Sequence, residues 1–88
     1  MKIEELARIL DKQLEIMYPD DSGDWYASFK YGEVKDGSIL TSYTGRGNTP
    51  NAALRDYVKD IAGKLMVFNA GSLTLRMEFK MPFDLEAK

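Results

Sequence analysis

The chain of 88 residues contains no cysteine and no histidine. Without cysteine there is no disulfide framework, as is usual for proteins of reducing compartments. The two absences also remove the commonest nucleophiles and general bases, and nearly all ligands for zinc, haem and iron–sulfur clusters. Carboxylate pairs such as Asp56 and Asp60 are flanked by Arg55 and Lys59, which indicates solvated charge rather than acid–base chemistry. We therefore expect a protein that is not an enzyme and that needs no cofactor or metal ion.

Long hydrophobic runs are also missing. No segment approaches the ~20 consecutive apolar residues of a membrane-spanning helix, and residues 1–18 carry charges where a signal peptide would have an apolar core. Hydrophobic residues make up 44% of the chain and charged residues 30%, as in folded globular domains and unlike disordered chains. We expect one soluble domain over 1–88, with a loose tail at 83–88, in the cytoplasm and without membrane contact.

Positive charge is scarce in the first part of the chain. The formal net charge is −2, so the field of the whole molecule does not attract nucleic acid. Residues 1–24 contain three basic and seven acidic side chains, a net charge of −4, whereas residues 25–88 contain nine basic and seven acidic ones, a net charge of +2. Two interpretations stay open: a solvated acidic helix on a neutral body, or a mildly basic sheet surface that is available to a partner.

Two segments show the spacing of amphipathic helices. In the first, apolar residues recur every three or four positions from Ile3 to Met17, and Pro19 marks the end. In the second, Thr49 is a favourable N-cap, Pro50 suits the first helical position, and residue 63 is a glycine suited to the C-terminal end. The pattern predicts a first helix over 3–17 and a second from about residue 50 to 62.

Alternation with a period of two indicates strands in the rest of the chain. It runs from Trp25 to Val34, continues in β-prone residues over 39–44 after a glycine turn, and returns at 65–68 and 72–81. The residues predicted to face inward are Trp25, Ala27, Phe29 and Tyr31 in the first strand, and Leu73, Leu75, Met77, Phe79 and Met81 in the last. The order α-β-β-α-β-β predicts an α+β fold, with a mostly antiparallel four-stranded sheet, both helices packed on one face and the other face open.

Glycines in the stretch 45-GRGNTP-50 raise the question of phosphate binding. A Walker loop needs G-x-x-x-x-G-K-[ST], and a dinucleotide fingerprint needs a third glycine where Pro50 stands. The free N–H groups at a helix start can hold an anion, but a capping Thr49 satisfies part of that demand, so we interpret the stretch as a turn and helix cap. The run 20-DDSGD-24 lacks the sixth-position glycine and twelfth-position glutamate of a calcium loop, and we interpret it as an exposed turn.

Three segments carry a family resemblance: WYASFKYGEV, GRGNTPNAALRDYVKDIAGK and RMEFKMP. With these segments, nearly the whole chain resembles a group of small uncharacterised proteins from phages and prophages of Gram-positive bacteria. The resemblance implies a phage-type origin and a host cytoplasm, and it brings no established activity. Residues 45–62 have a more limited likeness to HicB-type antitoxin domains, without their appended DNA-binding segment. The build is also similar to double-stranded-RNA-binding domains, but 49-TPNA-52 replaces the basic cluster at the start of their last helix.

The leading functional hypothesis is a non-enzymatic accessory protein of phage type that binds another protein through the open sheet face or a sheet edge. The candidate contact residues, chosen for their outward strand phase or loop position, are Tyr26, Lys30, Tyr43, Arg46, Arg76 and Lys80. The alternative is a weak nucleic-acid-binding protein, whose tyrosines would stack on bases and whose basic residues would contact phosphates. An exposed sheet edge would also allow a homodimer.

Overall fold

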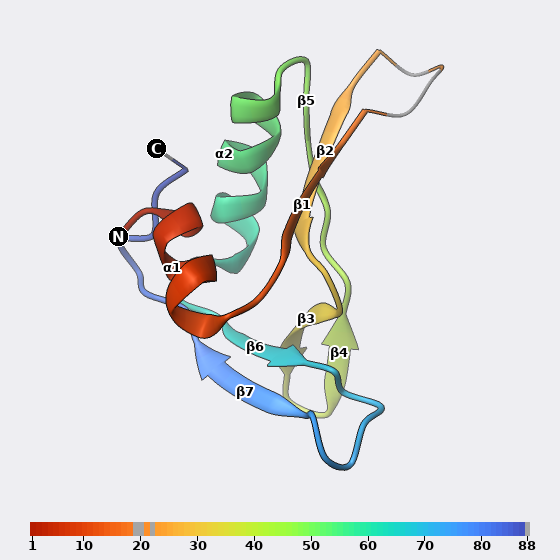
Figure 1. The fold of residues 1–88 in the computed structure, drawn as a ribbon, viewed down its shortest axis with the longest axis vertical. Coiled ribbons are helices and arrows are strands. Elements are labelled where there is room, and N and C mark those ends of the chain that lie inside the picture. Colours follow the sequence, from red (N-terminus) through yellow and green to blue (C-terminus); the bar gives the residue numbers. More distant parts are fainter. Residues whose placement is uncertain (19–20, 22, 88) are drawn as a thin grey trace.

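The computed structural model describes residues 1–18, 21 and 23–87, and it has the α+β fold predicted from the sequence (Figure 1). Every strand pair is antiparallel, and the predicted four-stranded sheet is present in the order β4-β3-β6-β7. A second sheet, in the order β1-β2-β5, was not predicted. The elements are α1 (Ile3–Leu10), β1 (Leu14–Met17), β2 (Trp25–Phe29), β3 (Gly32–Asp36), β4 (Ile39–Thr41), β5 (Gly45–Gly47), α2 (Pro50–Ile61), β6 (Leu65–Phe68) and β7 (Met77–Lys80).

The first helix is shorter than its apolar spacing predicts. It ends at Leu10 because Asp11 adopts the left-handed conformation, with φ 54°. The prediction of a helix to Met17 is therefore wrong, and residues 14–17 form β1 against β2. The run 14–17 fits both a helical and an alternating pattern, and strand pairing decides between them because it satisfies backbone groups of both strands. Pro19, predicted to end this helix, and Asp20 and Ser22 of the predicted turn lie outside the described residues.

The strand predicted over 25–34 is divided in two at Lys30 and Tyr31. Tyr31 has φ 60°, a left-handed conformation that is uncommon for residues other than glycine. The chain turns there, so that β2 belongs to the three-stranded sheet and β3 to the four-stranded sheet. Ala27 and Phe29 are buried as predicted, whereas Tyr31, predicted to face inward, is 67% exposed.

Helix α2 confirms its prediction and covers one face of the three-stranded sheet, against β5 and β2 (Figure 1). The Thr49 side chain accepts a hydrogen bond from the Ala52 N–H at 3.0 Å, as expected of an N-cap. A Cβ atom at Gly45 would lie 2.5 Å from the Cβ of Tyr57, and one at Gly47 would lie 2.6 Å from the Cβ of Ala52. Both glycines are thus explained by the close approach of the helix to β5.

The core connects the two sheets through Phe29. Its ring centroid lies 6.1 Å from that of Tyr57 in α2 and 5.4 Å from that of Phe68 in β6. The Phe29 N–H donates to the Tyr57 hydroxyl at 3.0 Å, in the interior. β5 reaches only as far as Ala27 along β2, so the tyrosine takes the place of a neighbouring strand for this amide.

Residues 85–87 are anchored beside the start of α1, so the prediction of a loose tail is wrong for them, whereas Phe83 is 82% exposed. Leu85 and Ala87 are buried, and the Ile3 N–H donates to the Glu86 carbonyl at 2.7 Å. The Lys2 ammonium lies 3.0 Å from the Glu86 carboxylate. The tail thereby satisfies a backbone donor at the start of α1, where Lys2 provides no side-chain cap. The last predicted tail residue, Lys88, lies outside the described residues.

The last strand begins at Met77, five residues later than its alternation predicts. The Ser72 hydroxyl accepts hydrogen bonds from the N–H groups of Thr74, at 3.3 Å, and Leu75, at 3.0 Å, which folds this segment into a turn. Leu73 and Leu75, predicted to face the core, are therefore exposed, Leu75 by 66%.

Candidate functional site

The three-stranded sheet has an outer face, on the side away from α2. The register places Met17 beside Tyr26 and Tyr26 beside Arg46, so one row of side chains crosses all three strands. Ala27 is buried on the α2 side, and side chains alternate along a strand, so this row faces outward. We call this surface the Tyr26 face, and it consists of Glu15, Met17, Asp24, Tyr26, Ser28, Lys30 and Arg46.

Arg46 is held in a fixed position on this face. Its Nε donates to the Asp24 carboxylate at 2.6 Å, and its guanidinium carbon lies 5.8 Å from the centre of the Tyr26 ring. Its backbone N–H donates to the Asp56 carboxylate of α2 at 2.9 Å. The hydrogen bond to Asp24 and the electrostatic influence of Tyr26 raise the pKa of Arg46 above its ordinary value. Arg46 is therefore a permanent, oriented cation stacked beside an aromatic ring.

The charges on the Tyr26 face are mixed. Lys30 and Arg46 supply two cations, and Glu15 and Asp24 supply two carboxylates. Lys30 follows β2 in the outward phase, and its ammonium lies 5.2 Å from the centre of the Tyr31 ring. Tyrosine, arginine and methionine are enriched at protein interfaces, whereas a phosphate-binding surface needs a positive excess that this face lacks.

The other predicted contact residues lie outside this face. Tyr43, between β4 and β5, lines a cavity of about 320 Å³ together with Lys35 and Lys64. Arg76 and Lys80 belong to the β7 region of the four-stranded sheet. The structure thus brings Tyr26 and Arg46 together, with Lys30 at the end of the same strand, and it separates the other three.

Glu78 engages two of the basic groups of the four-stranded sheet. Its carboxylate lies 3.0 Å from Arg76 and 3.6 Å from Lys35. The hydrogen bond from Arg76 and the charge of Lys35 hold the pKa of Glu78 below its ordinary value. The Lys80 ammonium lies 5.5 Å from the centre of the Phe83 ring. The basic residues of this sheet are thus partly neutralised and do not form a cationic patch.

Sequence reasoning missed two residues of the Tyr26 face, Met17 and Asp24, and it missed Asp56 of α2, which holds the backbone of Arg46. Met17 was assigned to a helix, because its spacing from Leu10 and Leu14 fits a helical pattern. Asp24 and Asp56 carried no local signal for their contacts, because the partner Arg46 is distant from each in the sequence. The Asp56 carboxylate, considered for acid–base chemistry, instead accepts a hydrogen bond from the backbone N–H of Arg46 in β5.

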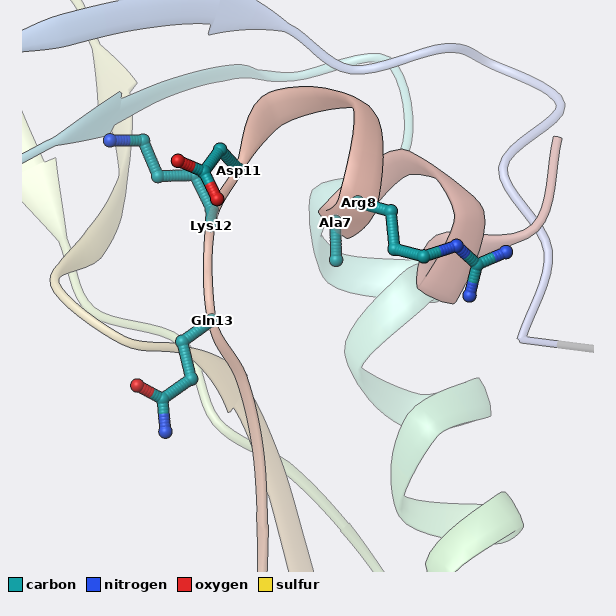
Figure 2. A pocket seen from close by; sticks show the side chains of 5 residues that line it. All are labelled: Ala7, Arg8, Asp11, Lys12 and Gln13. Carbon is teal, nitrogen blue, oxygen red and sulfur yellow. The ribbon is translucent and has the colours of Figure 1, made fainter.

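A cavity of about 440 Å³ lies between the end of α1 and the start of β1, lined by Ala7, Arg8, Asp11, Lys12 and Gln13. Figure 2 shows that the Arg8 and Lys12 side chains point in opposite directions. The charged groups do not converge on one point, so we assign no ligand to this cavity.

Within the described residues, no three carboxylates are grouped closely enough to hold a metal ion. Neither helix in this part of the chain is long and apolar enough to cross a membrane. Comparison of the chain with protein-family models, with curated proteins and with solved structures finds no match.

Proposed function

We propose that the protein is a non-enzymatic accessory protein of phage type, which acts in the host cytoplasm by binding another protein through the Tyr26 face. The observation that carries the proposal is the row of Met17, Tyr26 and Arg46 across three strands. It combines an exposed apolar side chain, a half-buried aromatic ring and an oriented cation. Tyrosine and arginine are enriched at the hot spots of protein interfaces, and methionine is enriched at interfaces in general.

Each residue of the row has a separate role in binding. The Tyr26 ring, on the central strand β2, and the Met17 side chain, on the edge strand β1, provide adjacent apolar contact area. Arg46 uses its Nε for Asp24, and the terminal nitrogens of its guanidinium can donate to a carboxylate or to backbone carbonyls of the partner. Because Asp24 fixes the Arg46 side chain before binding, less rotamer entropy is lost on association.

The balance of charges favours a protein partner over nucleic acid. The Tyr26 face carries as many carboxylates as cations, and Arg46 is ion-paired with Asp24 at 2.6 Å. A phosphate would have to displace or tolerate the Asp24 carboxylate, which costs binding energy. Nucleic-acid binding remains the second candidate, because Tyr26 and Arg46 together also offer a surface on which a base can stack.

The test uses immobilised wild-type protein and three variants, Tyr26→Ala, Arg46→Ala and the control Lys59→Ala on α2. Proteins retained from host lysate by the wild type and by Lys59→Ala are identified, purified and titrated against all four. We expect Tyr26→Ala and Arg46→Ala each to weaken binding by about tenfold or more, as at interface hot spots. Equal affinity of a purified partner for all four proteins would rule out the Tyr26 face as the binding surface.

A second titration separates the two candidate functions. Labelled single-stranded DNA, duplex DNA and duplex RNA are added at low and at physiological salt, and fluorescence anisotropy is followed. A protein-binding module gives no saturable signal with any of the three. Saturable binding that weakens steeply with salt would make nucleic-acid binding the leading candidate function. If Arg46→Ala abolished that binding, the nucleic-acid site would lie on the Tyr26 face.

A further inference from the structure

Strand β7 is one of the two edge strands of the four-stranded sheet, in the order β4-β3-β6-β7 (Figure 1). Just beyond the paired segment, the Met81 N–H donates to the Lys64 carbonyl at 2.8 Å. Hydrogen-bonded residues alternate along an antiparallel pair. The backbone groups of Phe79 and Met77 therefore also point toward β6.

The intervening residues of β7 present their backbone to the outside. The N–H and C=O groups of Glu78 and Lys80 point away from β6, and no other strand of the described chain lies beyond them. Unpaired backbone groups of this kind are a template for one more strand. The occupant that these groups specify is an extended segment of protein.

The side chains along this edge alternate in charge. Arg76, Glu78 and Lys80 carry a positive, a negative and a positive charge on one side of the strand. On the other side, Met77 and Phe79 are half-buried against the core. A strand with this pattern is complementary to a second copy of itself that runs antiparallel, provided the copies are aligned to place opposite charges together.

We propose that a second copy of this chain pairs with β7 in antiparallel orientation, with the two-fold axis at Met77. Arg76 of each copy then lies opposite Glu78 of the other, and the paired segment ends where the Ser72 turn begins. An axis at Glu78 is disfavoured because it opposes like charges. An axis at Phe79 places Arg76 of one copy opposite Pro82 of the other, and a proline has no backbone N–H to donate.

The proposed pairing extends both the apolar side and the charged side of β7 into the second copy. The apolar side of β7 meets the apolar side of its copy, so the cluster containing Met77 and Phe79 extends across the axis. The charged side keeps its ion pairs, since Arg76 exchanges its own Glu78 for that of the second copy. The surface is separate from the Tyr26 face, which belongs to the other sheet.

The first test uses the absence of cysteine from the chain. In the proposed register the two residues 77 face each other as a non-hydrogen-bonded pair with Cα atoms about 4.5 Å apart, a separation that a disulfide spans. We expect Met77→Cys to form a disulfide-linked dimer on mild oxidation. Phe79→Cys stays monomeric on a denaturing gel, because the two residues 79 are offset by about 13 Å along the strands. Cross-linking of Phe79→Cys alone, of neither variant or of both equally would overturn this register.

The second test reverses charges and follows the mass by sedimentation velocity from about 1 µM to about 1 mM. We expect the wild type to dimerise and Glu78→Lys to raise the dissociation constant by about tenfold or more, since it opposes like charges twice. The double variant Arg76→Glu/Glu78→Lys restores the dimer because it exchanges both signs. Glu78→Lys/Lys80→Glu does not, because Arg76 then faces a lysine. A monomeric wild type, or restoration by the second pair only, would overturn the proposal, and thermal melts confirm that each variant is folded.

Discussion

The hydroxyl of Tyr57 offers the sharpest test of the core. It accepts the buried N–H of Phe29 at 3.0 Å, and the Tyr57 side chain is almost fully buried. In Tyr57→Phe the ring remains but the N–H loses its acceptor. An unsatisfied buried donor costs about 1–3 kcal/mol. For a domain of this size, about 2 kcal/mol corresponds to a fall in Tm of roughly 8–16 °C.

The same hydroxyl makes the stability depend on alkaline pH. Burial raises the pKa of Tyr57 from its ordinary value of 10.0 to about 12. The unfolded chain therefore loses this proton at lower pH than the folded protein. The contribution of the neutral Tyr57 hydroxyl to the free energy of unfolding is fully present below pH 10 and is lost as the pH rises toward 12. At about pH 11.5 the loss amounts to about 2 kcal/mol.

The assay is chemical denaturation of the wild type and of Tyr57→Phe at neutral pH and at about pH 11.5. Other tyrosines and lysines titrate in both proteins, so their effects cancel in the difference, which should shrink by about 2 kcal/mol at the higher pH. Tyr43→Phe is the matched control, because Tyr43 is partly exposed and its hydroxyl has no partner among the described residues. A Tyr57→Phe protein whose free energy of unfolding at neutral pH lies within about 0.5 kcal/mol of the wild-type value would refute the hydrogen bond's contribution.

Further predictions concern close packing, the tail and the helix cap, each measured by urea denaturation. Gly45→Ala should destabilise the fold by about 1–3 kcal/mol or more, because its Cβ would lie 2.5 Å from Tyr57. Gly71→Ala, where a Cβ meets open space, should stay within about 0.5 kcal/mol of the wild type. Equal effects would contradict the packing of α2 on β5. Leu85→Ala should cost about 2–5 kcal/mol, whereas a loose tail would give no change. Thr49→Ala should cost about 1 kcal/mol through the lost cap, and an unchanged midpoint would show that the cap is not formed in solution.

The sequence was sufficient where local signals were redundant. Helix α2 was predicted because Thr49, Pro50 and the apolar spacing after them all indicate the same element. The alternation of Ala27 and Phe29 gave the inner face of β2 for the same reason. These elements depend on residues close together in the chain, so their signals do not require knowledge of the tertiary fold.

Prediction was wrong where local patterns were ambiguous. Residues 14–17 fit a helix as well as a strand, and only the pairing with β2 decides. Alternation continues through Leu73 and Leu75, but the Ser72 hydroxyl captures two N–H groups and forms a turn instead. No pattern in the sequence signals the left-handed conformation of Tyr31, so the sequence predicted one sheet where the structure has two. This division also separates Arg76 from Tyr26, so the candidate site could be predicted only in part.

The contact between the tail and α1 has a consequence for how the chain reaches its fold. α1 leaves the ribosome before residues 85–87, yet the Lys2 side chain beside it bonds to a residue 84 positions later. Until residues 85–87 have been synthesised, the buried stripe of α1 lacks part of its cover, and closing so long a loop is slow compared with local pairing. The first helix is thus among the last elements to be secured, and we expect the nascent chain to complete its fold only after residues 85–87 have emerged.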